Sequence, residues 1–179
     1  MRYFIFLLLI FFASLAMGQD PIWLLVDTQK KLIQVKQGSQ TLANFENISI
    51  GRQGAGHKEK SGDDITPLED YNITYTNVNS HFRTFYGLNY PSLSDAGLAL
   101  SDERISYSEY EQIIQAHSDN TLPPQDTSLG GQIGIHGVGN GDKKIQGVFD
   151  WTHGCVALSN QQIDKLAQWV YKGMQVQIK

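Results

Sequence analysis

The chain has 179 residues, of which 41% are hydrophobic and 18% charged, a composition that fits one compact domain better than two. Lys and Arg total 14 against 18 Asp and Glu, giving a net charge of −4 without any long basic run, so nucleic-acid binding is not expected. The 17 glycines and 5 prolines follow no period, which excludes collagen-like and solenoid repeat architectures.

The first residues have the pattern of a secretory signal peptide. Arg2 precedes an apolar stretch from Tyr3 to Leu15, and small residues follow at the two positions that a signal peptidase reads. We therefore expect residues 1–18 to be a signal peptide and residues 19–179 to form one domain exported to the periplasm or cell envelope. A retained membrane anchor is the alternative, because the uncharged run is just long enough to span a bilayer.

The chain after this segment is predicted to be mainly β. Five stretches rich in apolar, β-branched or aromatic residues predict strands: 22–26, 31–35, a run that ends at 50, 71–78 and 81–90. Turn signals at residues 27–30 and 37–39 separate the first three of them. Residues 51–64, rich in Gly, Lys and Asp, are predicted to form an exposed loop.

Two segments have helical patterns. Residues 106–116 place apolar side chains at helical spacing with acidic residues near the start, and residues 159–172 open with a capping-box pattern and stop before Gly173. Residues 92–104 and 118–129 are expected to be loops. The predicted fold class is mainly β with short helices.

Cys155 is the only cysteine, which is unusual for an exported protein because cysteines in oxidising compartments normally pair. It lies in a glycine-rich segment, residues 130–158, that also contains His136 and His153. If residues 152–156 are extended, His153 and Cys155 share one face, and the backbone of Gly154 can approach a substrate closely.

This combination predicts a cysteine nucleophile. A free thiol has a pKa of about 8.5, so an adjacent imidazole has to draw off its proton, and we expect the pKa of Cys155 to be depressed. The backbone amides of Gly154 and Cys155 are candidate oxyanion donors. Two alternatives stay open on the residues alone. One is a metal site whose fourth ligand would be Asp150 or a distant His, which the lack of paired cysteines disfavours, and the other is a buried inert thiol.

Two motifs resemble the signature of the L,D-transpeptidase catalytic-domain family, a His-Gly element followed by Ser/Thr-His-Gly-Cys. They are residues 133–137 (IGIHG) and 152–156 (THGCV). Further matches extend across most of the chain: Val26-Asp27 with Leu32 and Val35, residues 62–67 (GDDITP), residues 85–91 (FYGLNYP) and Asp150-Trp151-Thr152. The Asp-Trp-Thr element is similar to a Gram-negative-type branch of the family.

The resemblance implies a β-sandwich-like domain that acts on peptidoglycan stem peptides without a metal or other cofactor. By motif, Cys155 is the nucleophile, His136 its general base and acid, and His153 an orienting or polarising group. The implied role is in peptidoglycan biosynthesis, cell wall organisation and cell shape. Tyr86 and Tyr90 are candidates for lining the substrate groove.

The same resemblance leaves the reaction open. The thioester on Cys155 can pass to an amine, as in a transpeptidase, or to water, as in an L,D-carboxypeptidase or an amidase that releases an envelope protein from peptidoglycan. A non-enzymatic peptidoglycan-binding domain is a third alternative. The chain also departs from the family pattern at two positions. The family usually has Arg two residues after the nucleophile, where this chain has Ala157, and Gly shortly after the Thr-Pro pair, where this chain has Glu69.

Overall fold

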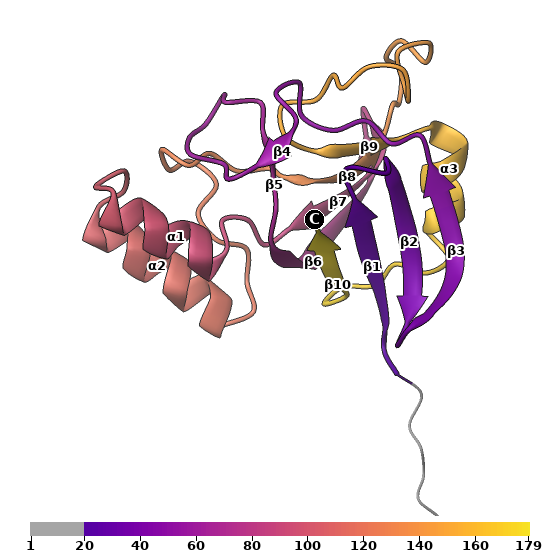
Figure 1. Ribbon diagram of the computed structural model, residues 1–179. Coiled ribbons are helices and arrows are strands. Elements are labelled where there is room, and N and C mark those ends of the chain that lie inside the picture. Colours follow the sequence, from indigo (N-terminus) through magenta and orange to yellow (C-terminus); the bar gives the residue numbers. More distant parts are fainter. Residues whose placement is uncertain (1–19) are drawn as a thin grey trace, which may run out of the picture.

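The computed structural model describes residues 20–179, in which a curved eight-stranded sheet is the largest element (Figure 1). Its strand order is β3-β2-β1-β10-β6-β7-β8-β9. The strands are β1 (Ile22–Asp27), β2 (Leu32–Gln37), β3 (Gln40–Glu46), β6 (Asp70–Ser80), β7 (Arg83–Leu88), β8 (Gly134–Gly137), β9 (Val156–Leu158) and β10 (Gln175–Ile178). A separate short ladder pairs β4 (Ala55–Gly56) with β5 (Thr66–Pro67).

The prediction of a mainly β fold is confirmed, and the hairpins formed by β1, β2 and β3 follow the predicted turns. The alternating apolar residues explain the pairing: Leu24 lies opposite Val35, and both side chains are fully buried. The predicted signal peptide lies outside the described residues. Within residues 20–179, no helix has the length and hydrophobicity required to cross a membrane.

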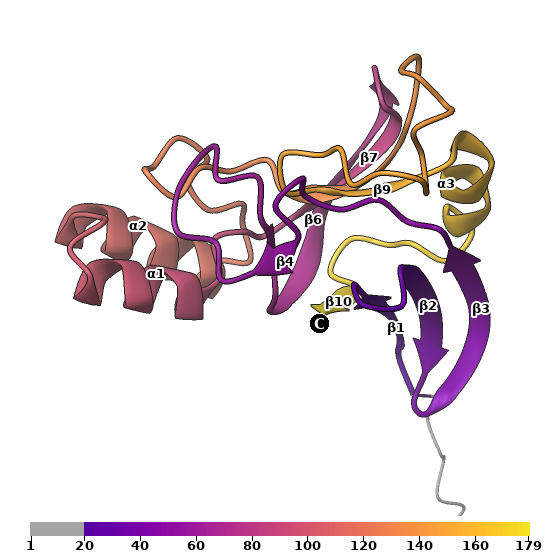
Figure 2. The same cartoon turned by 45° about the horizontal axis from the view of Figure 1, so that its top comes forward.

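The segment after β3 closes one end of the sheet. Ser49 and Ala157 exchange two backbone hydrogen bonds of 3.0 and 2.7 Å, so this segment covers the outer edge of β9. Figure 2 shows it crossing beside β9 on its way to β4. A second bridge joins Gly51 to Thr152, three residues before Cys155.

Three helices flank the sheet: α1 (Leu93–Ser101), α2 (Tyr107–Ser118) and α3 (Asn160–Leu166). The helices α1 and α2 form a pair beyond β6, whereas α3 lies at the far side near β3 and β9 (Figure 1). Each begins with a complete capping box, with Ser92, Ser106 and Ser159 as the N-cap residues.

Two expectations about helices were wrong. Residues 92–104 were expected to be a loop, but the hydroxyl of Ser92 accepts the Asp95 N–H at 3.0 Å and starts α1. The helix predicted to end at Gly173 ends at Leu166, because residues 167–170 turn so that Trp169 and Val170 pack on the core.

Candidate active site

A cavity of about 410 Å³ opens where β8 and the residues before β9 lie side by side. Eleven residues line it: Arg52, Phe82, Phe85, Gly131, Gln132, Ile133, His136, Trp151, Thr152, His153 and Cys155. Three aromatic rings and Ile133 form an apolar part of its wall, and polar or ionisable side chains form much of the rest, a combination expected of a binding site. The structure therefore brings together Cys155, His136 and His153, the three side chains predicted to carry chemistry.

Cys155 lies directly before β9, and a short hydrogen-bonded turn positions it. The hydroxyl of Thr152 donates to the Cys155 carbonyl at 2.7 Å and accepts the Gly154 N–H at 3.1 Å. The Gly154 amide, expected to face an oxyanion, is thus already bonded within this turn. The Cys155 thiol donates to the Gln132 carbonyl oxygen at 3.2 Å.

Gly154 breaks the extended run predicted for residues 152–156. Its φ of +126° lies in the region that favours glycine, and a Cβ there would be 2.7 Å from the Ile65 carbonyl oxygen. The bend turns His153 outward, so that its side chain is 73% exposed, whereas Cys155 is only partly exposed. The two residues line one cavity but do not share a strand face.

His136 sits in the middle of β8 and is 2% exposed. Its Nδ1 lies 2.7 Å from the Gly137 carbonyl oxygen, which can only accept, so Nδ1 carries the proton and Nε2 keeps its lone pair. The rings of Phe82, Phe85 and Trp151 surround the imidazole at centroid distances of 4.2, 5.9 and 5.8 Å. This burial lowers the pKa of His136 to about 4, so the ring is neutral at pH 7.

The thiol is also neutral, contrary to the expectation from sequence. Burial raises the pKa of Cys155 to about 11, and this effect outweighs the opposing influence of the Gly134 backbone N–H and of the charge on Lys58. The thiol's hydrogen bond to the Gln132 carbonyl further favours the protonated form. The resting site therefore pairs a thiol with an imidazole, not a thiolate with an imidazolium.

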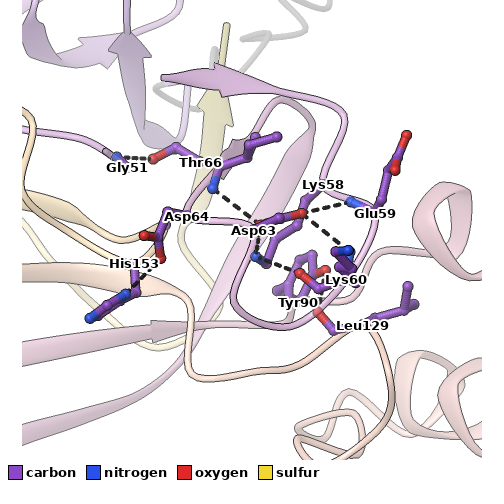
Figure 3. A network of polar contacts seen from close by, with 12 residues as sticks. Gly51, Lys58, Glu59, Lys60, Asp63, Asp64, Thr66, Tyr90, Leu129 and His153 are labelled. Atoms are coloured by element: carbon purple, nitrogen blue, oxygen red, sulfur yellow. Dashed lines mark hydrogen bonds and ion pairs between the residues drawn. The ribbon is translucent and has the colours of Figure 1, made fainter. Parts of the chain in front are cut away.

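The exposed His153 is held by a carboxylate that the sequence analysis did not identify. Its Nδ1 lies 2.6 Å from Asp64 Oδ1, and Figure 3 shows the two side chains pointing toward each other. The His153 hydrogen bond is the main cause that lowers the pKa of Asp64. Arg52 Nη1 lies 3.5 Å from the other Asp64 oxygen. The Gly-Asp-Asp motif was the one signal that pointed to this loop.

A buried ion pair shapes the loop that carries Asp64. Lys58 and Asp63 form a salt bridge with side chains 3% and 9% exposed, although residues 51–64 were expected to be an exposed loop. The Asp63 carboxylate also accepts the backbone N–H groups of Glu59, Lys60 and Ile65 at 2.9–3.2 Å (Figure 3). Four donors on one carboxylate fix the loop next to the cavity, and they hold the pKa of Asp63 below its usual range.

The two tyrosines predicted to line a substrate groove lie in the core instead. Tyr86 is 3% exposed and Tyr90 is fully buried, with its hydroxyl donating to the Leu129 carbonyl at 3.0 Å. Tyr86 alternates with Phe85 along β7, so the side chain that faces the cavity is Phe85. Phe85, Phe82 and Trp151 provide the aromatic wall.

Asp150, weighed as a further metal ligand beside the cysteine and histidines, does not line the cavity. Asp150 accepts from Lys31 Nζ at 2.6 Å and from the Ile50 N–H at 3.1 Å. Across residues 20–179, no cluster of three or more His, Cys, Asp or Glu side chains is arranged as metal ligands.

Comparison with known proteins identifies the family. Residues 21–178 match the YkuD family, the L,D-transpeptidase catalytic domain, and because this match covers most of the sequence, the chain belongs to that family. The resemblance inferred from the motifs around His136 and Cys155 is thereby confirmed. A search of curated protein sequences gives no significant match.

Several solved structures share the fold. The helical cell shape determining protein Pgp2 from Campylobacter jejuni is 22% identical with a TM-score of 0.61, over 90% of this chain and 49% of that one. Bd1075 from Bdellovibrio bacteriovorus is 19% identical with a TM-score of 0.55, over 93% of this chain and 50% of that one. The L,D-transpeptidase from Xylanimonas cellulosilytica is 12% identical with a TM-score of 0.50, over 92% of this chain and 63% of that one. This chain thus spans about half the length of Pgp2 and Bd1075.

The ion pair in the loop predicts a stability effect. Replacing Asp63 with alanine strands the buried Lys58 ammonium and three backbone N–H groups, so the free energy of unfolding should fall by about 3–5 kcal/mol. Urea denaturation followed by circular dichroism measures this change. Asp164→Ala is the matched control, because it removes an exposed ion pair with Arg83 and should have little effect. Equal losses in the two variants would contradict the assignment.

The raised pKa of Cys155 predicts slow alkylation. The iodoacetamide rate of the folded protein, followed by mass spectrometry, should rise about tenfold per pH unit through pH 9 without a plateau, because only the thiolate reacts. The same chain unfolded in urea is the control and should show an inflection at about pH 8.5. A plateau below pH 8 in the folded protein would show that the thiol is acidic after all.

Proposed function

We propose that the chain is an exported L,D-transpeptidase-type cysteine acyltransferase that acts on peptidoglycan stem peptides through a thioester on Cys155. The observation that carries the proposal is the cavity shared by the Cys155 thiol and a buried, neutral His136 whose protonated Nδ1 is fixed by the Gly137 carbonyl. Family membership supports the substrate class. In this proposal, residues 1–18 are the signal peptide and residues 19–179 the catalytic domain.

The first half of the reaction forms the thioester. The thiol proton passes to His136 Nε2 while the Cys155 sulfur bonds to the carbonyl carbon between an L-centre and a terminal D-amino acid. Negative charge then develops on the carbonyl oxygen, where the Cys155 N–H is the nearer candidate donor, since the Gly154 N–H is bonded to Thr152. The carbon–nitrogen bond breaks, and His136 returns its proton to the leaving amine.

The second half releases the acyl group. An amine of a second stem peptide attacks the thioester carbon, gives its proton to His136, and the Cys155 thiol is restored as the carbon–sulfur bond breaks. The neutral resting state suits this cycle because His136 is already an available base at pH 7. The product is a direct cross-link between two stem peptides.

Hydrolysis of the same thioester is the second candidate function. His153 and Gln132, which line the cavity, are both solvent-exposed, so water reaches the mouth of the site as readily as an amine does. Water in place of the amine gives an L,D-carboxypeptidase, or an amidase where the released group is an envelope protein.

Muropeptide analysis separates these functions. Incubating the purified domain with peptidoglycan should produce new cross-links between two diamino-acid residues, detected by mass spectrometry and absent with Cys155→Ala. Trimmed stems or freed protein without new cross-links would instead establish the hydrolase. Unchanged muropeptides with active-site thiol intact would leave a binding domain as the function.

The two histidines should differ in their contribution to turnover. His136→Ala removes the base, and kcat should fall by about 10²–10⁴-fold. His153→Ala should lose less, because its exposed ring is held by Asp64, and Asp64→Asn should match His153→Ala if the carboxylate acts through that ring. Steady-state kinetics on a stem tetrapeptide measures all three variants. A larger loss for His153→Ala than for His136→Ala would reverse the roles.

A further inference from the structure

Arg52 is the one permanently charged side chain among the cavity residues in the described part of the chain, 20–179. The other lining groups are aromatic, aliphatic, amide, hydroxyl, thiol or imidazole, and the buried imidazole of His136 is neutral. The fixed charge on the lining of the cavity is therefore the Arg52 cation, and the nearest opposite charge is the carboxylate of Asp64, which lies outside the lining at 3.5 Å from the guanidinium.

The backbone of Arg52 is anchored next to the nucleophile. Its N–H donates to the Thr152 carbonyl at 3.0 Å, and the neighbouring Gly51 N–H donates to the Thr66 hydroxyl at 2.8 Å. Thr152 is also the residue whose hydroxyl binds the Cys155 carbonyl. The same short turn thus positions both the thiol and the base of the arginine side chain.

The guanidinium of Arg52 is held less firmly than those of the other arginines of residues 20–179, and most of its donors are unused. Arg83 makes a two-point contact with Asp164 at 2.6 and 2.6 Å, and Arg104 donates to the Glu59 carbonyl at 2.8 Å and to Asp102 at 3.2 Å. Arg52 is half-exposed, and its ion pair with Asp64 is a single contact of 3.5 Å. Asp64 keeps its 2.6 Å bond to His153 if Arg52 changes partner.

The position where the family usually has arginine cannot supply this charge. Ala157 is fully buried, paired with Ser49 on one side and with His136 across the β8–β9 ladder on the other. The segment that covers Ala157 continues directly to Arg52. The cation at this site therefore comes from the covering segment, three residues after Ser49.

We propose that Arg52 binds the carboxylate of the terminal D-amino acid of the stem peptide and so selects substrates with a free C-terminus. The inference rests on the proposed function, in which the scissile amide joins that terminal residue to an L-centre. Its carboxylate lies within one residue of the carbonyl that Cys155 attacks, and a planar guanidinium with unused donors binds a carboxylate at two points.

Binding to a catalytically inactive protein tests this inference separately from turnover. The probes are a stem tetrapeptide with a free terminal carboxylate and the same peptide with a carboxamide terminus, titrated by calorimetry into Cys155→Ala protein. The carboxylate peptide should bind about 10–100-fold more tightly than the carboxamide. Adding Arg52→Gln should abolish this difference without weakening carboxamide binding, and Arg52→Lys should restore part of it.

Arg83→Gln in the same background is the matched control, because that arginine is not among the cavity residues and its exposed guanidinium binds Asp164, so it should leave both affinities unchanged. Equal binding of the two peptides, absence of binding, or an equal loss for both peptides in Arg52→Gln would overturn the assignment. Turnover by the wild-type protein would in each case leave the proposed function intact. Failure of turnover together with an Arg52-dependent carboxylate preference would reject the transferase and keep the binding site.

Discussion

The pairing of Ser49 with Ala157 is the contact on which the site depends. These two residues join the segment after β3 to the edge strand β9, whose other edge is paired with β8. An unpaired edge at this place would leave the backbone groups next to Cys155 open to water and to other chains. The covering segment satisfies them and also carries Arg52 into the wall of the cavity.

Burial sets the charge states of Cys155 and His136. Both Cys155 and His136 are shifted toward their neutral forms, because the surrounding aromatic rings cannot solvate a charge. In the mechanism we propose, charge is created only while the new bond to sulfur forms, when the substrate carbonyl oxygen and its hydrogen-bond donors can accept it. The charges of the Lys58–Asp63 pair and of Asp64 lie on the loop of residues 51–64 beside the cavity. Hydrogen bonds hold each of them in a fixed position there.

Local patterns predicted local structure well. The N-terminal hairpins follow turn residues that are adjacent in sequence, and the starts of α2 and α3 follow Ser-x-x-Glu and Ser-x-x-Gln capping boxes. The helix α1 was missed because its box uses Asp95 as the reciprocal acceptor and follows directly after Pro91, which indicated a loop. The end of α3 depends on packing of Trp169, which no local pattern reveals.

Properties set by tertiary contacts could not be predicted in the same way. The motifs identified Cys155 and His136, but the sign of the thiol's pKa shift depends on burial by residues distant in sequence. His153 meets Asp64 across 89 positions of the chain, and its orientation follows from the positive φ of Gly154. Tyr86 was a candidate for the substrate groove, but alternation along β7 turns its neighbour Phe85 into the cavity and buries Tyr86.

The protonated state of Cys155 also bears on the chemical stability of this thiol. Oxidation by peroxide and exchange with disulfides both proceed through the thiolate, and their rates follow its fraction. A thiol whose pKa is raised to about 11 exposes little thiolate at neutral pH. The chain has no second cysteine with which to resolve an oxidised Cys155. A thiol that stays protonated at neutral pH is thus protected against oxidation and disulfide exchange.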